Sequence, residues 1–185
     1  EIGAVLAFSA TQNNDKIGVI FFSDKVEKFI PPKKGKSHIL RIIRELIAFE
    51  PENKGTDIGE ALRYFNNVIK KRAICFVISD FMGENFEAPL KIANKKHDIV
   101  TISINDKREE ELPDIGLIQM KDAESGEVKW IDTGNKSVRH NYRKNYLQIK
   151  EEVNQLFINS GVDTIQLRTD MDYMCKTVEL AIKCG

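Results

Sequence analysis

The chain has 185 residues, of which 42% are hydrophobic and 30% are charged. This composition is that of a globular domain with a sizeable core, and it excludes disordered and fibrous proteins. Twenty-eight basic residues balance twenty-eight acidic ones, so no net charge draws the chain to nucleic acid or an anionic membrane.

No apolar run in the sequence approaches the roughly 20 residues that a membrane-spanning helix requires. We therefore expect no membrane segment in this chain. The three cysteines are widely spaced and form no CxxC pair, which favours a reducing, cytoplasmic compartment over a disulfide framework.

Apolar periodicity and turn residues predict the following elements in chain order. They are a helix at residues 2–10, strands at 17–23 and 26–30, helices at 39–47 and 58–71, a strand at 73–79, a helix at 86–96, a strand at 97–104, a hairpin near 117–131, a helix at 136–160, a strand at 162–168 and a helix at 169–183.

Local signals refine some of these elements. We expect Pro31 and Pro32 to end the second strand, Ser37 to cap the helix that follows it, and Gly126 to form the hairpin turn. The charged stretch at 106–111 reads as a solvated loop.

Strands that alternate with helices predict a doubly wound α/β domain, with a mostly parallel sheet, helices on both faces and a small added hairpin. The sequence contains no repeat and no linker, so residues 1–185 are expected to form one domain. Residues 73–78 are apolar on both faces, as a central parallel strand requires, and the strand at 97–104 is read as a second buried strand beside it.

Ligands of such sheets bind beyond the carboxyl ends of the strands, and Asp80 follows directly after the strand at 73–79. A turn-capping role explains this aspartate equally well. Thr56 and Asp57 precede the helix at 58–71, and the spacing of Asp57 and Glu60 is close to that of a capping box. Thr56 is then left as a hydroxyl outside the helix, on the same side of the sheet as Asp80.

Several motifs together resemble a von Willebrand factor A-type domain, and more narrowly the bacterial domain-of-unknown-function family fifty-eight. The motifs that carry the resemblance are "TDIGEAL" at 56–62, "VISDF" at 77–81, "HDIVTISINDKREEELP" at 97–113 and "DAESGE" at 122–127. Lys107 stands where the family usually has proline. The resemblance spans almost the whole chain and implies a von Willebrand A-like, Rossmann-like fold.

The resemblance also implies a metal-ion-dependent adhesion site for Mg²⁺ or Mn²⁺, with Thr56 and Asp80 as two of its elements. A DxSxS loop after the first, central strand is the remaining element, and this sequence does not contain it. We therefore expect the chain to be truncated at its N-terminus, so that it binds the ion weakly or not at all. The absent strand would lie between the strands at 17–23 and 73–79. We expect to find there a gap filled by unassigned residues, a strand donated by another molecule, or direct pairing of these two strands.

The function implied is that of a non-enzymatic interaction module which binds a protein partner, with a MoxR-type AAA+ ATPase as the partner that the family suggests. An alternative from the residues is a phosphoryl-transfer enzyme of haloacid-dehalogenase or receiver type with Asp80 as nucleophile. The absence of a second nearby acid argues against this alternative. Nucleic-acid binding through Arg139, Arg143 and Lys144 ranks third, because the aromatic residues near them continue a helical core pattern.

Overall fold

The computed structural model describes residues 2–53, 55–83, 85–121 and 126–170. Its elements are α1 (Ile2–Gln12), β1 (Ile17–Phe22), β2 (Val26–Lys33), α2 (Lys36–Ala48), α3 (Ile58–Val68), β3 (Ile74–Ser79), α4 (Glu87–Lys96), β4 (Asp98–Asn105), α5 (Lys107–Glu110), β5 (Leu117–Lys121), β6 (Val128–Asp132), α6 (Lys136–Ser160) and β7 (Asp163–Arg168). The helix predicted at 169–183 lies outside the described residues apart from its first two positions.

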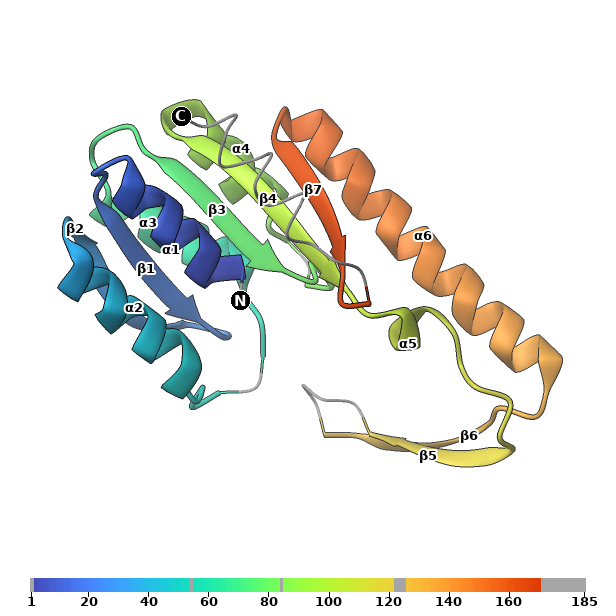
Figure 1. Ribbon diagram of the computed structural model, residues 1–185. Coiled ribbons are helices and arrows are strands. Elements are labelled where there is room, and N and C mark those ends of the chain that lie inside the picture. Colours follow the sequence, from blue (N-terminus) through green and yellow to red (C-terminus); the bar gives the residue numbers. More distant parts are fainter. Residues whose placement is uncertain (1, 54, 84, 122–125, 171–185) are drawn as a thin grey trace.

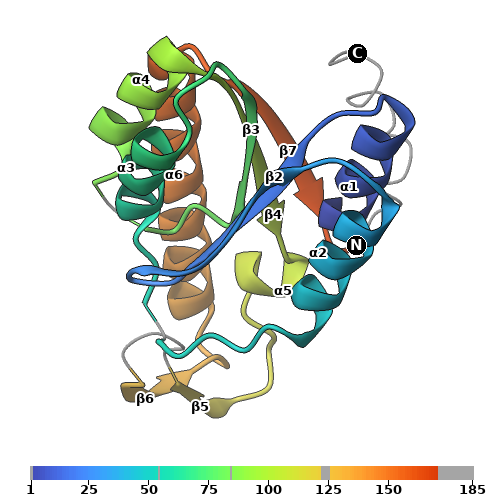
Figure 2. The same ribbon diagram turned by 90° about the vertical axis from the view of Figure 1, so that its left-hand side faces the viewer.

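The architecture is α/β, as predicted, with helices on both faces of the strands. One layer holds α1 and α2, and the opposite layer holds α3, α4 and α6 (Figures 1 and 2). Strands β3, β4 and β7 form a parallel sheet in the order β3-β4-β7. The adjacency of β3 and β4 is confirmed, and the register pairs Val77 with Thr101.

The main core lies between the parallel sheet and the layer of α3, α4 and α6. Its buried members are apolar residues of these elements, of the loop after β3 and of the turn between α6 and β7: Ile58, Leu62, Phe65, Val77, Phe81, Phe86, Leu90, Ala93, Ile99, Phe157 and Val162. Burial of this apolar surface is the main stabilising contribution to the fold.

Two local predictions were wrong. Strand β2 continues through both prolines to Lys33, because among the described strands it pairs only with β1 and an edge strand tolerates residues that cannot donate a backbone hydrogen bond. Helix α2 begins after Gly35, whose φ of 104° suits glycine, and no side chain caps this helix.

Two further boundaries differ from the predictions. The helix predicted at 58–71 ends earlier, at Val68. The stretch predicted as a loop at 106–111 contains the short helix α5, which Asp106 and Glu109 close with a capping box.

The described strands do not form one continuous sheet. β1 pairs with β2 only, and β3 pairs with β4 only, so the edges of β1 and β3 that face each other are unpaired among the described residues. A strand was predicted to be absent at this place, and the described residues leave a gap there rather than direct pairing of β1 with β3. Hairpin β5–β6 stands apart from both sheets, beyond the carboxyl ends of the strands (Figure 1).

Candidate functional site

The loops that follow β1 and β3 meet the loop that precedes α3 at one edge of the molecule. The backbone N–H of Asp57 donates to the carbonyl of Ser23, just after β1, at 2.8 Å. The carbonyl of Thr56 lies 3.4 Å from the position that a Cβ on Gly83 would occupy. The structure thus brings the Thr56 loop into contact with both neighbouring loops.

Asp57 is the N-cap of α3, as the sequence predicted. Its Oδ1 accepts a hydrogen bond of 2.7 Å from the backbone N–H of Glu60. The Glu60 carboxylate contacts Arg63 at 3.1 Å. Asp57 therefore has a structural role that accounts for its presence.

Replacing Asp57 with alanine is expected to lower the free energy of unfolding by roughly 1 kcal/mol, because the first turn of α3 loses its cap. Urea denaturation followed by circular dichroism measures this change. Asp57→Asn is the matched control and should retain most of the stability, since asparagine caps comparably. Equal stability of Asp57→Ala and the parent would remove the capping role.

Thr56 is exposed at the start of this loop. Within the described part of the chain no hydrogen bond of its hydroxyl is observed. It also lies among the residues that line the groove between β1 and β3. Its side chain is available to bind a ligand at the carboxyl edge.

Asp80 is exposed at the end of β3. Its Oδ1 accepts hydrogen bonds from the backbone N–H of Met82 at 3.2 Å and from the Ser79 hydroxyl at 3.3 Å. Phe81 follows with a φ of 57°, and its ring is 1% exposed and packs 4.9 Å from the ring of Phe157. Burial of the Phe81 ring thus holds a backbone conformation that is unfavourable for a bulky residue, and this fixes where Asp80 stands.

Lys150 of α6 is a neighbour of Asp80 that no sequence motif indicated. Its Nζ donates to the backbone carbonyl of Asp80 at 2.9 Å and lies 5.6 Å from the centre of the Tyr146 ring. Partial burial lowers the pKa of Lys150, while the nearby Asp80 carboxylate opposes this shift. The ammonium group therefore ties α6 to the loop that carries Asp80.

Glu27 of β2 holds the Thr56 loop in place. Its carboxylate accepts a 2.5 Å hydrogen bond from the Ser23 hydroxyl, and hydrogen bonds of 3.0 and 3.1 Å from the backbone N–H groups of Glu52 and Asn53. These donors, Ser23 foremost, lower the pKa of Glu27 from 4.5 to about 2. Glu27 is a positioning residue for the loop that leads to Thr56.

The lowered pKa of Glu27 predicts a pH-dependent contribution to stability. Its hydrogen bonds need the ionised carboxylate, so the contribution is complete above pH 4.5 and is lost as the pH falls towards about 2. Denaturation of the parent and of Glu27→Gln across this range measures it. The stability difference between the two proteins should shrink as the pH falls, and a difference that stays constant with pH would contradict this role.

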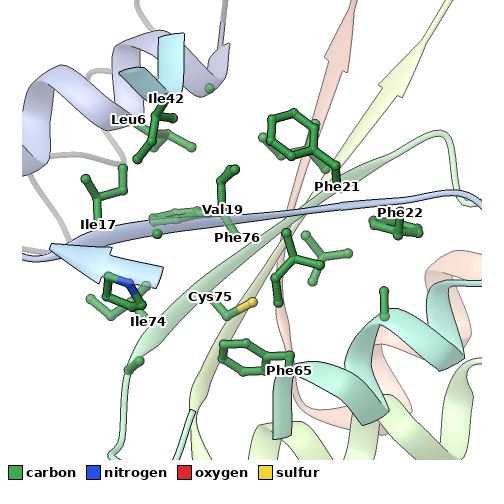
Figure 3. Close-up of a pocket in the computed structure, with 18 of the residues that line it drawn as sticks. Leu6, Ile17, Val19, Phe21, Phe22, Ile42, Phe65, Ile74, Cys75 and Phe76 are labelled. Carbon is green, nitrogen blue, oxygen red and sulfur yellow. The ribbon is translucent and has the colours of Figure 1, made fainter. Parts of the chain in front are cut away.

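A groove of about 1480 Å³ separates β1 from β3. Figure 3 shows side chains of both strands facing it, with Leu6 and Ile42 on the side of α1 and α2 and Phe65 on the side of α3. Burial raises the pKa of the Cys75 thiol on β3 to about 12, so this cysteine is an inert apolar residue. The groove thus combines apolar walls with two unpaired strand edges.

The side chains at the carboxyl edge have the oxygen atoms that a hard cation binds, but there are too few of them to hold it. Hydroxyl and carboxylate oxygens such as those of Thr56 and Asp80 are the ligands that Mg²⁺ takes. Among the described residues, however, there is no group of three or more His, Cys, Asp or Glu side chains that could hold a metal ion. Thr56 and Asp80 would therefore need further oxygen ligands from outside this set.

The chain is thus an α/β domain in which a parallel sheet of β3, β4 and β7 is separated from the antiparallel pair β1–β2. Loops that carry hydroxyl and carboxylate groups lie at the carboxyl ends of β1 and β3. The chain belongs to the family described as "Protein of unknown function DUF58", whose model matches residues 1–152. Membership in this family, expected from the motifs, is confirmed.

Sequence relatives carry no functional description. The uncharacterized protein Rv1480 of Mycobacterium tuberculosis (strain ATCC 25618 / H37Rv) is 24% identical over 178 residues, which are 95% of this chain and 56% of that protein. The uncharacterized protein MAV169 of Mycobacterium avium is 26% identical over 152 residues, which are 80% of this chain and 89% of that protein. The chain thus spans little more than half the length of Rv1480.

Among solved structures, the fold resembles that of an aerotolerance-related membrane protein from Bacteroides fragilis NCTC 9343, crystallised with multiple mutations to serines. The TM-score is 0.58 at 17% identity, over 100% of this chain and 88% of that chain. At this identity the match supports the fold alone. Within the described residues of our chain, no helix is both long and apolar enough to span a membrane.

Proposed function

We propose that the protein is a non-enzymatic interaction module of von Willebrand factor A type, with Thr56 and Asp80 as two ligands of a Mg²⁺ or Mn²⁺ ion. The observation that carries the proposal is the meeting of the Thr56 loop with the loop of Asp80, at the carboxyl edge and beside the groove. When bound, the ion supplies an open coordination position for a carboxylate of a partner protein.

We propose further that residues outside 1–185 complete the metal site. The gap between β1 and β3 supports this. A strand in the groove would pair with both β1 and β3 and would be covered on both faces, so its sequence should be apolar throughout. Figure 1 places the start of α1 near the carboxyl ends of β1 and β3. A strand leading into α1 would therefore run parallel to both and would end beside Thr56 and Asp80, where its final loop adds the ligands that are lacking.

The partner in this proposal is a MoxR-type AAA+ ATPase, as the family resemblance suggests, and the module acts in the cytoplasm. The test is capture of the purified ATPase by the immobilised protein, extended on the amino-terminal side of Glu1, in Mg²⁺ and in EDTA. Capture should require Mg²⁺ and should be lost in Thr56→Val and in Asp80→Asn, but it should persist in Asp57→Asn. Capture that is equal in EDTA and in Mg²⁺ would refute the metal-dependent module.

Lys150 favours one second candidate, phosphoryl transfer with Asp80 as nucleophile. Its Nζ donates to the backbone carbonyl of Asp80 and interacts electrostatically with the Asp80 side chain, and a nearby cation stabilises a phosphoryl group. Incubation with acetyl phosphate followed by intact-mass measurement separates the two functions. A phosphoryl adduct that Asp80→Asn abolishes would establish the enzyme. No adduct is expected from an interaction module.

A further inference from the structure

The outer face of α2 presents apolar and basic side chains to solvent. Helix α2 lies in the layer opposite α3, α4 and α6 (Figure 2), and it buries Ile39 and Ile42 on its inner side. On its other side Leu40 is 58% exposed and Ile47 is 81% exposed. Leu46 is also 38% exposed but lines the groove between β1 and β3, so Leu40 and Ile47 are the two that face away from it.

These two residues alternate with basic residues along a single stripe. Lys36, Leu40, Arg44 and Ile47 follow one another at spacings of four, four and three residues, which places them on the same side of a helix. All four are exposed. We call this stripe the α2 outer face.

The charge from residue 33 to Arg44 is of one sign, although the whole chain is neutral and the exposed acids Glu50 and Glu52 follow the helix. Between residues 33 and 44 there is no acidic residue, and the basic ones are Lys33, Lys34, Lys36, Arg41 and Arg44, all exposed. The single acid of α2 is Glu45, which Lys28 contacts at 2.6 Å. That hydrogen bond, together with Arg41 and Arg44, lowers the pKa of Glu45, so its charge is already compensated.

We infer that the α2 outer face docks onto an anionic lipid surface. The basic residues match the charge of acidic headgroups, and each contributes to attraction at the membrane surface. Leu40 and Ile47 add apolar area that enters the boundary between headgroups and acyl chains. Lipid is favoured over nucleic acid, because contacts with the phosphates of a nucleic acid would gain nothing from the two exposed aliphatic side chains that alternate with the basic residues. The inference does not depend on the metal site.

Sedimentation of the purified protein with large vesicles tests this surface. The protein should bind vesicles of phosphatidylcholine with about one-third phosphatidylserine, should not bind pure phosphatidylcholine, and should be released as salt rises from about 0.05 to 0.5 M. Lys36→Glu/Arg44→Glu should weaken binding at least about 30-fold. Leu40→Ser/Ile47→Ser should weaken it about tenfold or more while leaving the charge unchanged.

Matched variants on other helices control for charge and for exposed apolar area. Lys95→Glu/Lys144→Glu makes the same change in net charge, and Ile92→Ser/Ile158→Ser removes two aliphatic side chains that are 53% and 62% exposed. Both controls should bind the anionic vesicles within about twofold of the parent. Circular dichroism confirms that each variant is folded.

Three outcomes would overturn the inference. One is that the parent does not sediment with the anionic vesicles at low salt. Another is that the charge controls lose as much binding as Lys36→Glu/Arg44→Glu, which would indicate unspecific attraction. The last is that Leu40→Ser/Ile47→Ser binds vesicles normally, while the parent binds a mixed-sequence DNA duplex at least as tightly, which would assign the face to a polyanion.

Discussion

Replacing Val77 with aspartate is expected to abolish soluble expression of the protein. Val77 is 8% exposed in the middle of β3 and belongs to the core that includes Phe81, Leu90 and Ile99. An unpaired carboxylate at this position should cost at least about 4 kcal/mol, which is comparable with the whole stability of many domains, about 5–15 kcal/mol. The soluble fraction after expression, and urea denaturation of any soluble material, measure the effect.

The same substitution on an exposed strand is the control. Val128 in β6 is 46% exposed, and Val128→Asp should change the free energy of unfolding by no more than about 0.5 kcal/mol. A soluble Val77→Asp protein that unfolds cooperatively would show that β3 is not a central strand.

A strand that fills the groove between β1 and β3 should strongly slow the hydrogen exchange of the backbone amides in these two strands. In the 185-residue chain, the amides of β1 and β3 that face the groove have no strand partner among the described residues, so they should exchange hydrogen rapidly. In a protein extended on the amino-terminal side of Glu1, a strand paired with both edges should slow their exchange by at least about 100-fold.

Hydrogen exchange followed by mass spectrometry or NMR makes this comparison, and β4 supplies an internal control. β4 is paired with β3 on one side and β7 on the other, so its exchange should already be slow and should change little on extension. Fast exchange of β1 and β3 in both proteins would contradict the presence of a strand in the groove.

The sequence predicted the elements that depend on local patterns. The strands predicted at 73–79 and 97–104 correspond to β3 and β4, and the spacing of Asp57 and Glu60 identified the cap of α3. Apolar periodicity and capping are determined by residues within a few positions of one another, so they are readable without a fold. The division of the sheet was foreseen from the family resemblance, because no local pattern reports which strands pair.

The residues that position the loops of the site, Glu27 and Lys150, could not be predicted from local sequence patterns. Glu27 receives hydrogen bonds from backbone groups 25 and 26 positions away, and Lys150 reaches a carbonyl 70 positions away. Neither residue lies in a recognisable motif. The start of α2 was predicted wrongly although its signals are local. Ser37 and Gly35 are both residues at which a helix can begin, and the helix begins after Gly35, which adopts the positive φ found there.

Titration calorimetry with Mg²⁺ shows whether Thr56 and Asp80 are ligands of a divalent cation, as we propose. In the protein extended beyond Glu1, Asp80→Asn should lower the Mg²⁺ affinity at least about 100-fold, and Thr56→Val should lower it about tenfold. Asp57→Asn, one residue from Thr56, is the control and should bind as the parent does. The 185-residue chain should bind weakly. Tight binding by Asp80→Asn, equal to that of the parent, would show that Asp80 is not a metal ligand and would leave it as a turn-capping residue.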